Sequence, residues 1–277
     1  MRTEYLSFRA ASNRFNIPLR NIENYAVIGE ELPYYTSGNR RYLRTSDIQK
    51  WLSNRRNYLF KLGRRDYLKC LDFAIRSYYA ERPKSNFGTT EQRDAGKIIS
   101  NYVLGKLGEM AIQKFLKNNF QVDSRLDFDL RDAIVGQDIS EIAKPRKGGR
   151  VYNPPRLNVA IKSSKMKNVF LIVSAKEVKD KNRKSDVYIF VRVDLYLNHL
   201  LRIMKSNKPL SKFRRLIPEF IAIDAEVCGY CKHSTLRKSR VVSILPNSNT
   251  KIQPSYIMKT GDLSNRWPDW TRLMNKL

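Results

Sequence analysis

The segment that most constrains the fold of this chain is the run 157–165, which reads Leu-Asn-Val-Ala-Ile-Lys-Ser-Ser-Lys. A short apolar run with β-branched residues is typical of a buried strand. This strand would carry one lysine, Lys162, to its end. Asp138 lies 24 positions earlier (162 − 138), at the start of a second expected strand, 138–142. We therefore expect an acid and a lysine to meet on neighbouring strands.

The chain is strongly cationic. Its 277 residues include 53 Lys and Arg against 26 Asp and Glu, which gives a net charge of +27. Such an excess repels itself in a compact state unless an anion shares the surface. Nucleic acid is the expected partner, because its phosphates release counterions when Lys and Arg bind them. A ribosomal-type protein and a membrane-surface protein are the plainer alternatives.

Composition also narrows the class of protein. Hydrophobic residues make up 42% of the chain, enough for a sizeable core. No stretch approaches the roughly 20 apolar residues of a membrane span, and the first residues lack a signal-peptide core. Three cysteines do not make a disulfide framework, so we expect a cytoplasmic protein. The Gly148-Gly149 pair lacks the Lys-Ser/Thr of a nucleotide-binding loop, so ATP is not expected.

The first 54 residues predict a small helical module. Ser7 can cap a helix that runs to Phe15, and Pro18 suits the first turn of a second helix, 19–25. Gly29 would end that helix. A hairpin with a basic tip is expected over 32–43, and a third helix starts at Ser46-Asp47.

This order resembles the winged helix-turn-helix domains of the MerR and phage-excisionase group, over roughly residues 5 to 54. The resemblance implies that the second helix enters the major groove and that the hairpin touches the DNA backbone. A helical protein-interaction module is the alternative. Carried over by position, the DNA-binding residues would be Arg20, Asn21 and Asn24 at base edges, and Arg40 and Arg41 at phosphates.

The rest of the chain predicts an α/β arrangement. We expect residues 1–56 to form the helix-turn-helix domain, 57–84 a helical linker with a helix over 64–81, and 85–277 a second domain. That second domain would open with a long helix over 90–118 and continue with strands, one of them over 186–193.

The second domain resembles the PD-(D/E)xK nuclease superfamily, and within it the type II restriction endonucleases, over roughly residues 90 to 195. Its features are Gly108-Glu109 in the leading helix, Asp138-Ile139 on one strand, residues 161–164 on the next, and residues 185–191 on a later strand. The resemblance implies a mixed sheet flanked by helices and hydrolysis assisted by Mg²⁺.

The chemistry of phosphodiester hydrolysis suits these residue types. Carboxylates that hold Mg²⁺ lower the pKa of a bound water, and a lysine can stabilise the developing charge. We assign Asp138 to the metal, Lys162 to the water and the scissile phosphate, and Glu109 to metal-bound water. Asp129 is the rival ligand. The plainer alternatives are a turn residue, a surface lysine and a solvated helix acid.

Ala160 departs from the family pattern, because the position two before the lysine is normally acidic. In one explanation the carboxylate comes from the element after the lysine strand, where Glu177 lies 15 positions beyond Lys162 (177 − 162). In the second, Asp138 and backbone carbonyls suffice. In the third, the acid has been replaced by alanine, naturally or by design, and the chain binds DNA without cutting it.

Two weaker signals lie near the C-terminus. Cys228 and Cys231 have the spacing of half a zinc site, but a second ligand pair is missing, so a buried strand is the preferred interpretation. His199 is expected to pack a helix. Trp267 and Trp270 are expected to fix the C-terminal segment to the core.

The sequence thus predicts a site-specific endonuclease of double-stranded DNA that uses Mg²⁺. Such enzymes usually form a homodimer, so that two sites address two strands. A DNA-binding regulator with a nuclease-like domain that does not cut is the second hypothesis, favoured by Ala160. A nuclease that recognises the shape of junctions or damaged DNA is the third.

Overall fold

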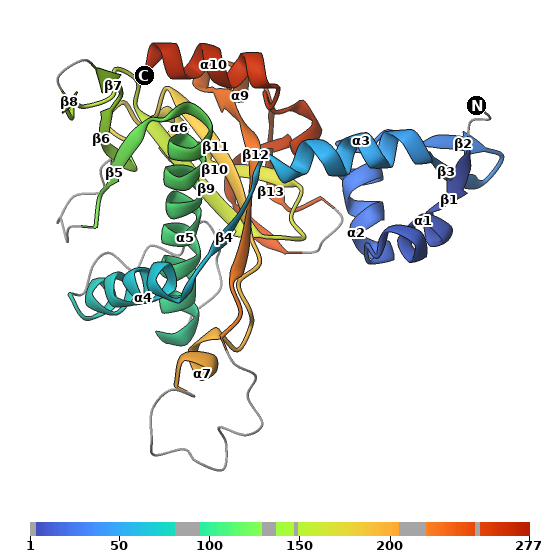
Figure 1. The fold of residues 1–277 in the computed structure, drawn as a ribbon, viewed down its shortest axis with the longest axis horizontal. Coiled ribbons are helices and arrows are strands. Elements are labelled where there is room, and N and C mark those ends of the chain that lie inside the picture. Colours follow the sequence, from blue (N-terminus) through green and yellow to red (C-terminus); the bar gives the residue numbers. More distant parts are fainter. Residues whose placement is uncertain (1–3, 81–94, 129–136, 147–148, 205–219, 247–249) are drawn as a thin grey trace.

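The protein is a mixed α/β structure with several sheets (Figure 1). The computed structural model describes residues 4–80, 95–128, 137–146, 149–204, 220–246 and 250–277. Figure 1 shows a smaller N-terminal body at one side of a larger body that is built around a central sheet.

The N-terminal body has the predicted order of helix, turn, helix, hairpin and helix. Ser7 caps the first helix, since its Oγ accepts a hydrogen bond from the Ala10 amide at 3.2 Å. The hairpin turns at Gly38, whose φ of 57° is a conformation that glycine adopts without strain. The elements are β1 (Tyr5–Ser7), α1 (Phe8–Phe15), α2 (Leu19–Glu23), η1, a π-helical turn (Asn24–Ile28), β2 (Tyr35–Ser37), β3 (Arg40–Arg44) and α3 (Thr45–Arg56).

The central sheet of the larger body has four strands in the order β4-β12-β11-β9. Strand β11 is buried along its whole length, which explains its continuous run of apolar residues around a single arginine. It pairs antiparallel with β12 and parallel with β9, so the sheet is mixed. The strands are β4 (Leu59–Leu62), β9 (Val159–Lys165), β11 (Val187–Val193) and β12 (Ile223–Lys232).

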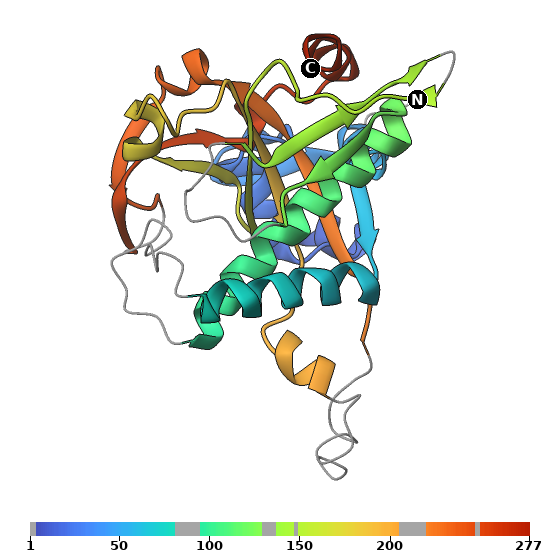
Figure 2. The same cartoon turned by 90° about the vertical axis from the view of Figure 1, so that its left-hand side faces the viewer.

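Helix α5 (Ala95–Phe120) crosses one face of this sheet, and α4 (Arg64–Tyr79) crosses the N-terminal part of α5 (Figure 2). The buried residues of α5 join Val159 and Ile161 of β9 in the main hydrophobic core. A hairpin of β5 (Asp123–Leu126) and β6 (Ile139–Ala143) lies beside α5 and leads into the region of β9.

A second sheet in the order β10-β14-β13 covers the other side. Its strands are β10 (Phe170–Ser174), β14 (Lys251–Lys259) and β13 (Arg240–Ile244), and α6 (Ala175–Lys179) follows β10 directly. The remaining elements are β7 (Pro145–Arg146), β8 (Gly149–Arg150), α7 (His199–Met204), α9 (His233–Leu236), η3, a 3₁₀ turn (Thr260–Asp262), and α10 (Trp267–Lys276).

The predicted helical linker over 57–84 is wrong in part. Helix α4 is present, but it is preceded by β4, which pairs with β12 in the central sheet. Phe60, Leu62 and Tyr67 belong to the main core. The segment is therefore a structural part of the larger body, and the N-terminal body ends where α3 meets the sheet.

The two bodies pack closely where glycine backbones meet. The Gly261 amide donates to the Gly29 carbonyl at 2.7 Å. A Cβ at Gly29 would lie 2.8 Å from the Thr260 Oγ1 and 2.9 Å from the Val169 Cβ, so a side chain would push the bodies apart. The hydrophobic core of the N-terminal body accordingly includes Val169 and Phe170 of the larger body.

A buried ionic network crosses the same junction. Arg192 of β11 has no exposed surface, and its guanidinium donates to both carboxylate oxygens of Glu31, at 2.7 and 3.0 Å. It also donates to Glu226 of β12 at 2.8 Å, and Glu226 accepts two further bonds of 2.6 Å from Arg55 of α3. Although burial works to raise it, Arg192 and Arg55 hold the pKa of Glu226 below its usual value.

The ring of Tyr25 lies between these two arginines. Its centroid is 4.8 Å from the Cζ of Arg192 and 4.9 Å from that of Arg55. A desolvated guanidinium over an aromatic face is attracted by the ring quadrupole. The network thus joins three elements of the N-terminal body to two strands of the central sheet.

His199 joins α7 to the helical layer, as the helix-packing interpretation predicts. The Tyr67 hydroxyl lies 2.7 Å from Nδ1 and the Ser100 hydroxyl 2.9 Å from Nε2. Burial lowers the pKa of this imidazole to about 4. Trp270 is fully buried, and Trp267 stacks on Phe120, so both tryptophans fix α10 to the core.

Substitution of Arg192 by methionine should destabilise the protein by about 3–5 kcal/mol, because it leaves Glu31 without its guanidinium partner and Glu226 with Arg55 alone. Urea unfolding measures this change. Arg76→Met is the matched control, since it breaks an exposed pair with Asp72 in α4 and should cost less than about 0.5 kcal/mol. A cost for Arg192→Met as small as that of the control would contradict the network's role.

The protein should lose stability in acid through His199. The folded pKa of about 4 lies below the ordinary histidine value of 6.5, so the stability is present above pH 6.5 and is lost as pH falls towards 4. The loss should be roughly 3 kcal/mol, and His199→Gln should remove that part of the pH dependence. Urea midpoints between pH 4 and 7 test this. The control His233→Gln, at the chain's other histidine, should keep the wild-type dependence, and identical curves for all three proteins would refute the assignment.

Candidate functional site

The two faces of β9 have different surroundings. Val159 and Ile161 pack in the core with α5, and we call this the α5 face. Ala160 lies in a separate apolar cluster with residues of α6 and of β11, and we call this the α6 face. Because side chains alternate along a strand, Lys162 lies on the α6 face with Ala160.

Asp138 lies at the open edge of β9, where the structure pairs it with the strand. Its backbone amide donates to the Val159 carbonyl at 3.0 Å. Its carboxylate Oδ2 accepts from the Ile161 amide at 2.6 Å. The acid is thus held next to the backbone that leads into Lys162. The bond to Ile161 leaves the second carboxylate oxygen able to accept a further ligand.

Glu177 reaches Lys162 from α6. The Lys162 Nζ lies 2.8 and 2.9 Å from the two carboxylate oxygens of Glu177. The side chains are 29% and 18% exposed, so the pair is open to a ligand from solvent. Ala175 and Val178, on either side of Glu177 in α6, pack in the same cluster as Ala160.

Ala160 itself is 4% exposed in apolar surroundings. A carboxylate on this residue would lose water without gaining hydrogen bonds from those apolar neighbours. The acid nearest to Lys162 in these surroundings is supplied by α6.

Glu109 is buried in α5 with Lys106 as its partner. The Lys106 Nζ lies 2.7 Å from the Glu109 Oε2 and donates to the Asp127 carbonyl at 2.6 Å. Burial and the nearby charge of Asp138 raise the pKa of Glu109 to about 8, against the opposing effect of Lys106. The surroundings of Glu109 therefore favour its protonated form, and its charged neighbours are Asp138 and Lys106.

Gly108 lets α5 lie close against β9. A Cβ at this residue would lie 2.9 Å from the Ser163 Cβ and closer still to its hydroxyl. Glycine is thus required by the close approach of the helix to the strand, and the next residue is Glu109.

The predicted site residues therefore fall into two groups around one strand. Asp138 and Glu109 interact on the edge and α5 side, and Lys162 and Glu177 form a pair on the α6 face. Glu109 and Lys162 were expected to serve one cluster, but they lie on different sides of β9 because α5 packs against the odd-numbered residues. Within the part of the chain that the structure describes, no group of three or more His, Cys, Asp or Glu side chains is placed to hold a metal ion.

Sequence reasoning missed Lys106. The i, i+3 spacing with Glu109 was the available signal, since residues three apart meet on one side of a helix. Asp129, the rival metal ligand, lies outside the described residues.

The residues assigned to DNA are placed differently. Arg20, Arg40 and Arg41 are exposed, and Asn21 is half-buried. Asn24 does not lie as expected for a residue that reads a base edge. Its side-chain amide donates to the Lys167 carbonyl at 3.3 Å, in the turn between β9 and β10. It faces the larger body, since the π-helical turn η1 continues α2 into the junction.

The cysteine pair agrees with the buried-strand interpretation. Cys228 and Cys231 lie within β12, both buried and free. Burial raises the pKa of the Cys231 thiol to about 12, which disfavours the thiolate that metal binding or nucleophilic attack requires.

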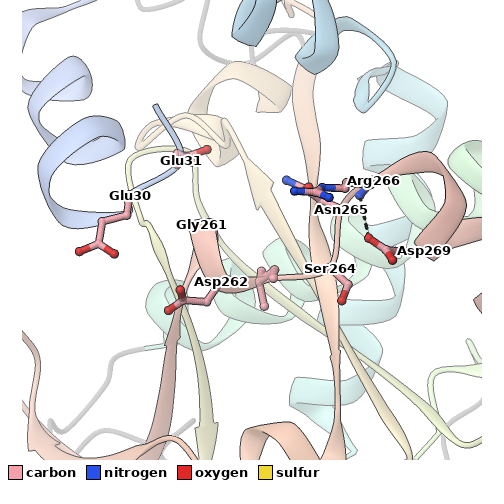
Figure 3. Close-up of a pocket in the computed structure, with 9 residues that line it drawn as sticks. Glu30, Glu31, Gly261, Asp262, Ser264, Asn265, Arg266 and Asp269 are labelled. Atoms are coloured by element: carbon pink, nitrogen blue, oxygen red, sulfur yellow. Dashed lines mark hydrogen bonds between the residues drawn. The ribbon is translucent and has the colours of Figure 1, made fainter. Parts of the chain in front are cut away.

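A separate pocket of about 340 Å³ lies at the junction of the two bodies (Figure 3). Its lining includes Glu30, Glu31 and Asp262, and Asp269 accepts a hydrogen bond from the Arg266 amide. None of the predicted catalytic residues lines it.

The fold and site thus define a mixed α/β protein with a small N-terminal body docked on a sheet, and two lysine–glutamate pairs lie on either side of strand β9. Comparison of the chain with protein-family models, with curated proteins and with solved structures finds no match. Among the helices that the structure describes, none is both long enough and apolar enough to cross a bilayer.

Replacing Glu109 by glutamine tests the buried acid. With a folded pKa of about 8 against the ordinary glutamate value of 4.5, Glu109 stabilises the folded state most below pH 4.5, and this stability is lost as pH rises through 8. Because glutamine stays neutral, the free energy of unfolding of Glu109→Gln should rise relative to the wild type by roughly a few kcal/mol as pH increases from 5 to 9. Urea unfolding across that range measures the gain. Parallel curves for the two proteins would show that Glu109 is already ionised at pH 5.

Proposed function

We propose that this chain is a Mg²⁺-dependent, sequence-specific endonuclease of double-stranded DNA, built on a PD-(D/E)xK-like core with an N-terminal winged helix-turn-helix domain. The observation that carries the proposal is the contact of Lys162 with Glu177, beside the strand edge that binds Asp138. It supports the explanation in which Glu177 replaces the acid missing at Ala160.

The donor set suits magnesium. Mg²⁺ prefers oxygen ligands, keeps several waters, and is commonly held by one or two carboxylates together with substrate phosphate oxygens. Asp138 and Glu177 are the two carboxylates next to residues 161 and 162 of β9. Asp138 would hold the ion from the edge of β9, together with waters and phosphate oxygens, and Glu177 would have to reach it around that edge from the α6 face as the second acidic ligand. When bound, the ion would lower the pKa of water and neutralise charge on the phosphate.

Lys162 would act on the phosphate. Its partly exposed ammonium is aligned by Glu177, and an incoming phosphate can share or take over this ion pair. A fixed ammonium beside the reacting oxygen stabilises the negative charge that develops during hydrolysis. Glu109, whose protonated form is favoured by burial, would act as a hydrogen-bond donor near Asp138 and not as a metal ligand.

The N-terminal body would supply sequence recognition. Its element order matches a helix-turn-helix with a hairpin wing, and Arg40 and Arg41 are exposed on that hairpin. Arg20 and Asn21 of α2 would read base edges, and the wing would contact phosphates. The net charge of +27 suits a duplex partner. A homodimer is the assembly we propose, because each site would then cut one strand.

A DNA-binding regulator that does not cut is the second candidate. Ala160 favours it, and so does the occupation of Lys162 by Glu177, because a closed ion pair also describes a purely structural contact. Both candidates bind duplex DNA, so the distinction between them is hydrolysis.

Incubation of the protein with mixed duplex DNA and Mg²⁺ should yield discrete fragments. Lys162→Ala, Glu177→Gln and Asp138→Asn should each lower the cleavage rate by roughly 10²-fold or more, since each removes a charge from the reacting phosphate. Gel shifts in Ca²⁺ should show that all three variants still bind DNA.

Glu141→Gln is the matched control, because Glu141 is a β6 carboxylate paired with Arg125 away from Lys162. It should cut at the wild-type rate. A gel shift without cleavage by the wild type would favour the regulator, and cleavage governed by DNA shape and not by base order would favour a structure-specific nuclease. Unchanged cleavage by Glu177→Gln would remove Glu177 from the site.

A further inference from the structure

The turn between β9 and β10 connects the candidate catalytic strand to the N-terminal body. The strand β9 ends at Lys165, and the exposed Lys167 follows two residues later. The Lys167 carbonyl accepts the hydrogen bond from Asn24 that links the turn to the helical segment of the N-terminal body. This turn therefore lies between two groups of residues that were expected to contact DNA from separate domains.

Hydrogen bonds hold the backbone of this turn in one conformation. The Asn168 amide donates to the Lys165 carbonyl at 2.9 Å, and the Met166 amide donates to Val193 of β11 at 3.1 Å. The side chain of Asn168 donates to the Ser164 hydroxyl at 2.8 Å. The two lysines are thus presented from a rigid support, while their own side chains are exposed.

Arg20 extends the same basic surface. It lies four residues before Asn24 along the continuous helical segment, so the two side chains lie on neighbouring parts of one face. Asn24 contacts the turn, and Arg20 is exposed beside it. Along the chain the exposed Lys165 and Lys167 follow Lys162 at the end of β9, and the Asn24 contact brings the helical segment that carries Arg20 to the same turn.

We propose that the turn formed by Lys165 to Asn168 binds the backbone of duplex DNA and makes the winged helix and the cleavage strand one continuous binding surface. This inference rests on the proposed function and adds where the DNA backbone would lie on the protein. A strand rises about 3.3 Å per residue, so the three residues from Lys162 to Lys165 span roughly 10 Å. That length corresponds to about three base pairs at a rise of 3.4 Å per step.

The buried network at the junction makes this spacing fixed. Arg192 and Arg55 lock the N-terminal body to β11 and β12, and the glycine contact between residues 29 and 261 leaves no room for sliding. The bases read by α2 should accordingly lie at a fixed distance from the cut phosphate, because the duplex passes the turn between the two.

The double variant Lys165→Gln and Lys167→Gln tests the proposal. Binding of the full-length protein to a 30-base-pair duplex is measured by fluorescence anisotropy from 50 to 300 mM KCl in Ca²⁺. Each phosphate contact contributes about 0.9 to the slope of log K against log salt, so the slope should become shallower by about 1.8. At 0.1 M salt this corresponds to a loss of affinity of about 60-fold, and the motif selected from random duplexes should not change.

Lys117→Gln with Lys276→Gln is the matched control of equal charge. Lys117 is 63% exposed, and Lys276 belongs to α10, whose end contacts Arg156 ahead of β9, at the opposite end of that strand from the turn. The control should keep the wild-type slope. An unchanged slope in the Lys165 and Lys167 variant, with wild-type binding and cleavage intact, would overturn this inference alone. Failure of the wild type to bind duplex DNA would overturn both this inference and the proposed function.

Discussion

The buried guanidinium of Arg192 is the interaction on which the arrangement of the molecule depends. It places a full positive charge inside the central sheet, where water cannot solvate it, and so two carboxylates must come to it. One comes from the neighbouring strand and the other from the N-terminal body. Docking of that body is therefore a condition for satisfying the charge, and the two parts of the chain form one structure.

Much of the local structure could be predicted from the sequence. The strands at β9 and β11 follow from apolar runs rich in β-branched residues, and the hairpin follows from the Gly38 turn between two short segments. These signals are local, so neighbouring residues suffice to read them. Glu177, which contacts Lys162, was among the residues that the resemblance suggested as a replacement for the acid missing at Ala160.

The errors arose where the outcome depended on distant residues. Strand β4 is only four residues long, and its partner in β12 lies more than 160 positions away, so no local pattern distinguishes it from a linker. Asn24 occupies a helix face that looks suited to DNA until the larger body is placed against it. The burial of Arg192 could not be foreseen either, because arginine is ordinarily exposed and its partners come from other segments.

The candidate site shows how one strand can separate two kinds of carboxylate. On the α6 face Glu177 is partly exposed and paired with Lys162. A partly exposed pair suits a carboxylate that a phosphate can displace from the lysine. On the α5 side Glu109 is buried near a second carboxylate, which favours its protonated form. The difference comes from packing: Glu109 lies in a helix of 26 residues whose buried side packs on β9, and Glu177 lies in a helix of five residues beside the partly exposed Lys162.

The absence of a side chain at Gly108 affects how precisely the distance between α5 and β9 is fixed. The main chain of α5 meets the Ser163 side chain directly there, so the gap between α5 and β9 is set by the helix backbone and one short serine side chain. The close contact at Gly108 therefore fixes the position of the next residue, Glu109, relative to the sheet. Rotamer changes of the surrounding side chains should therefore leave the distance between Glu109 and β9 unchanged.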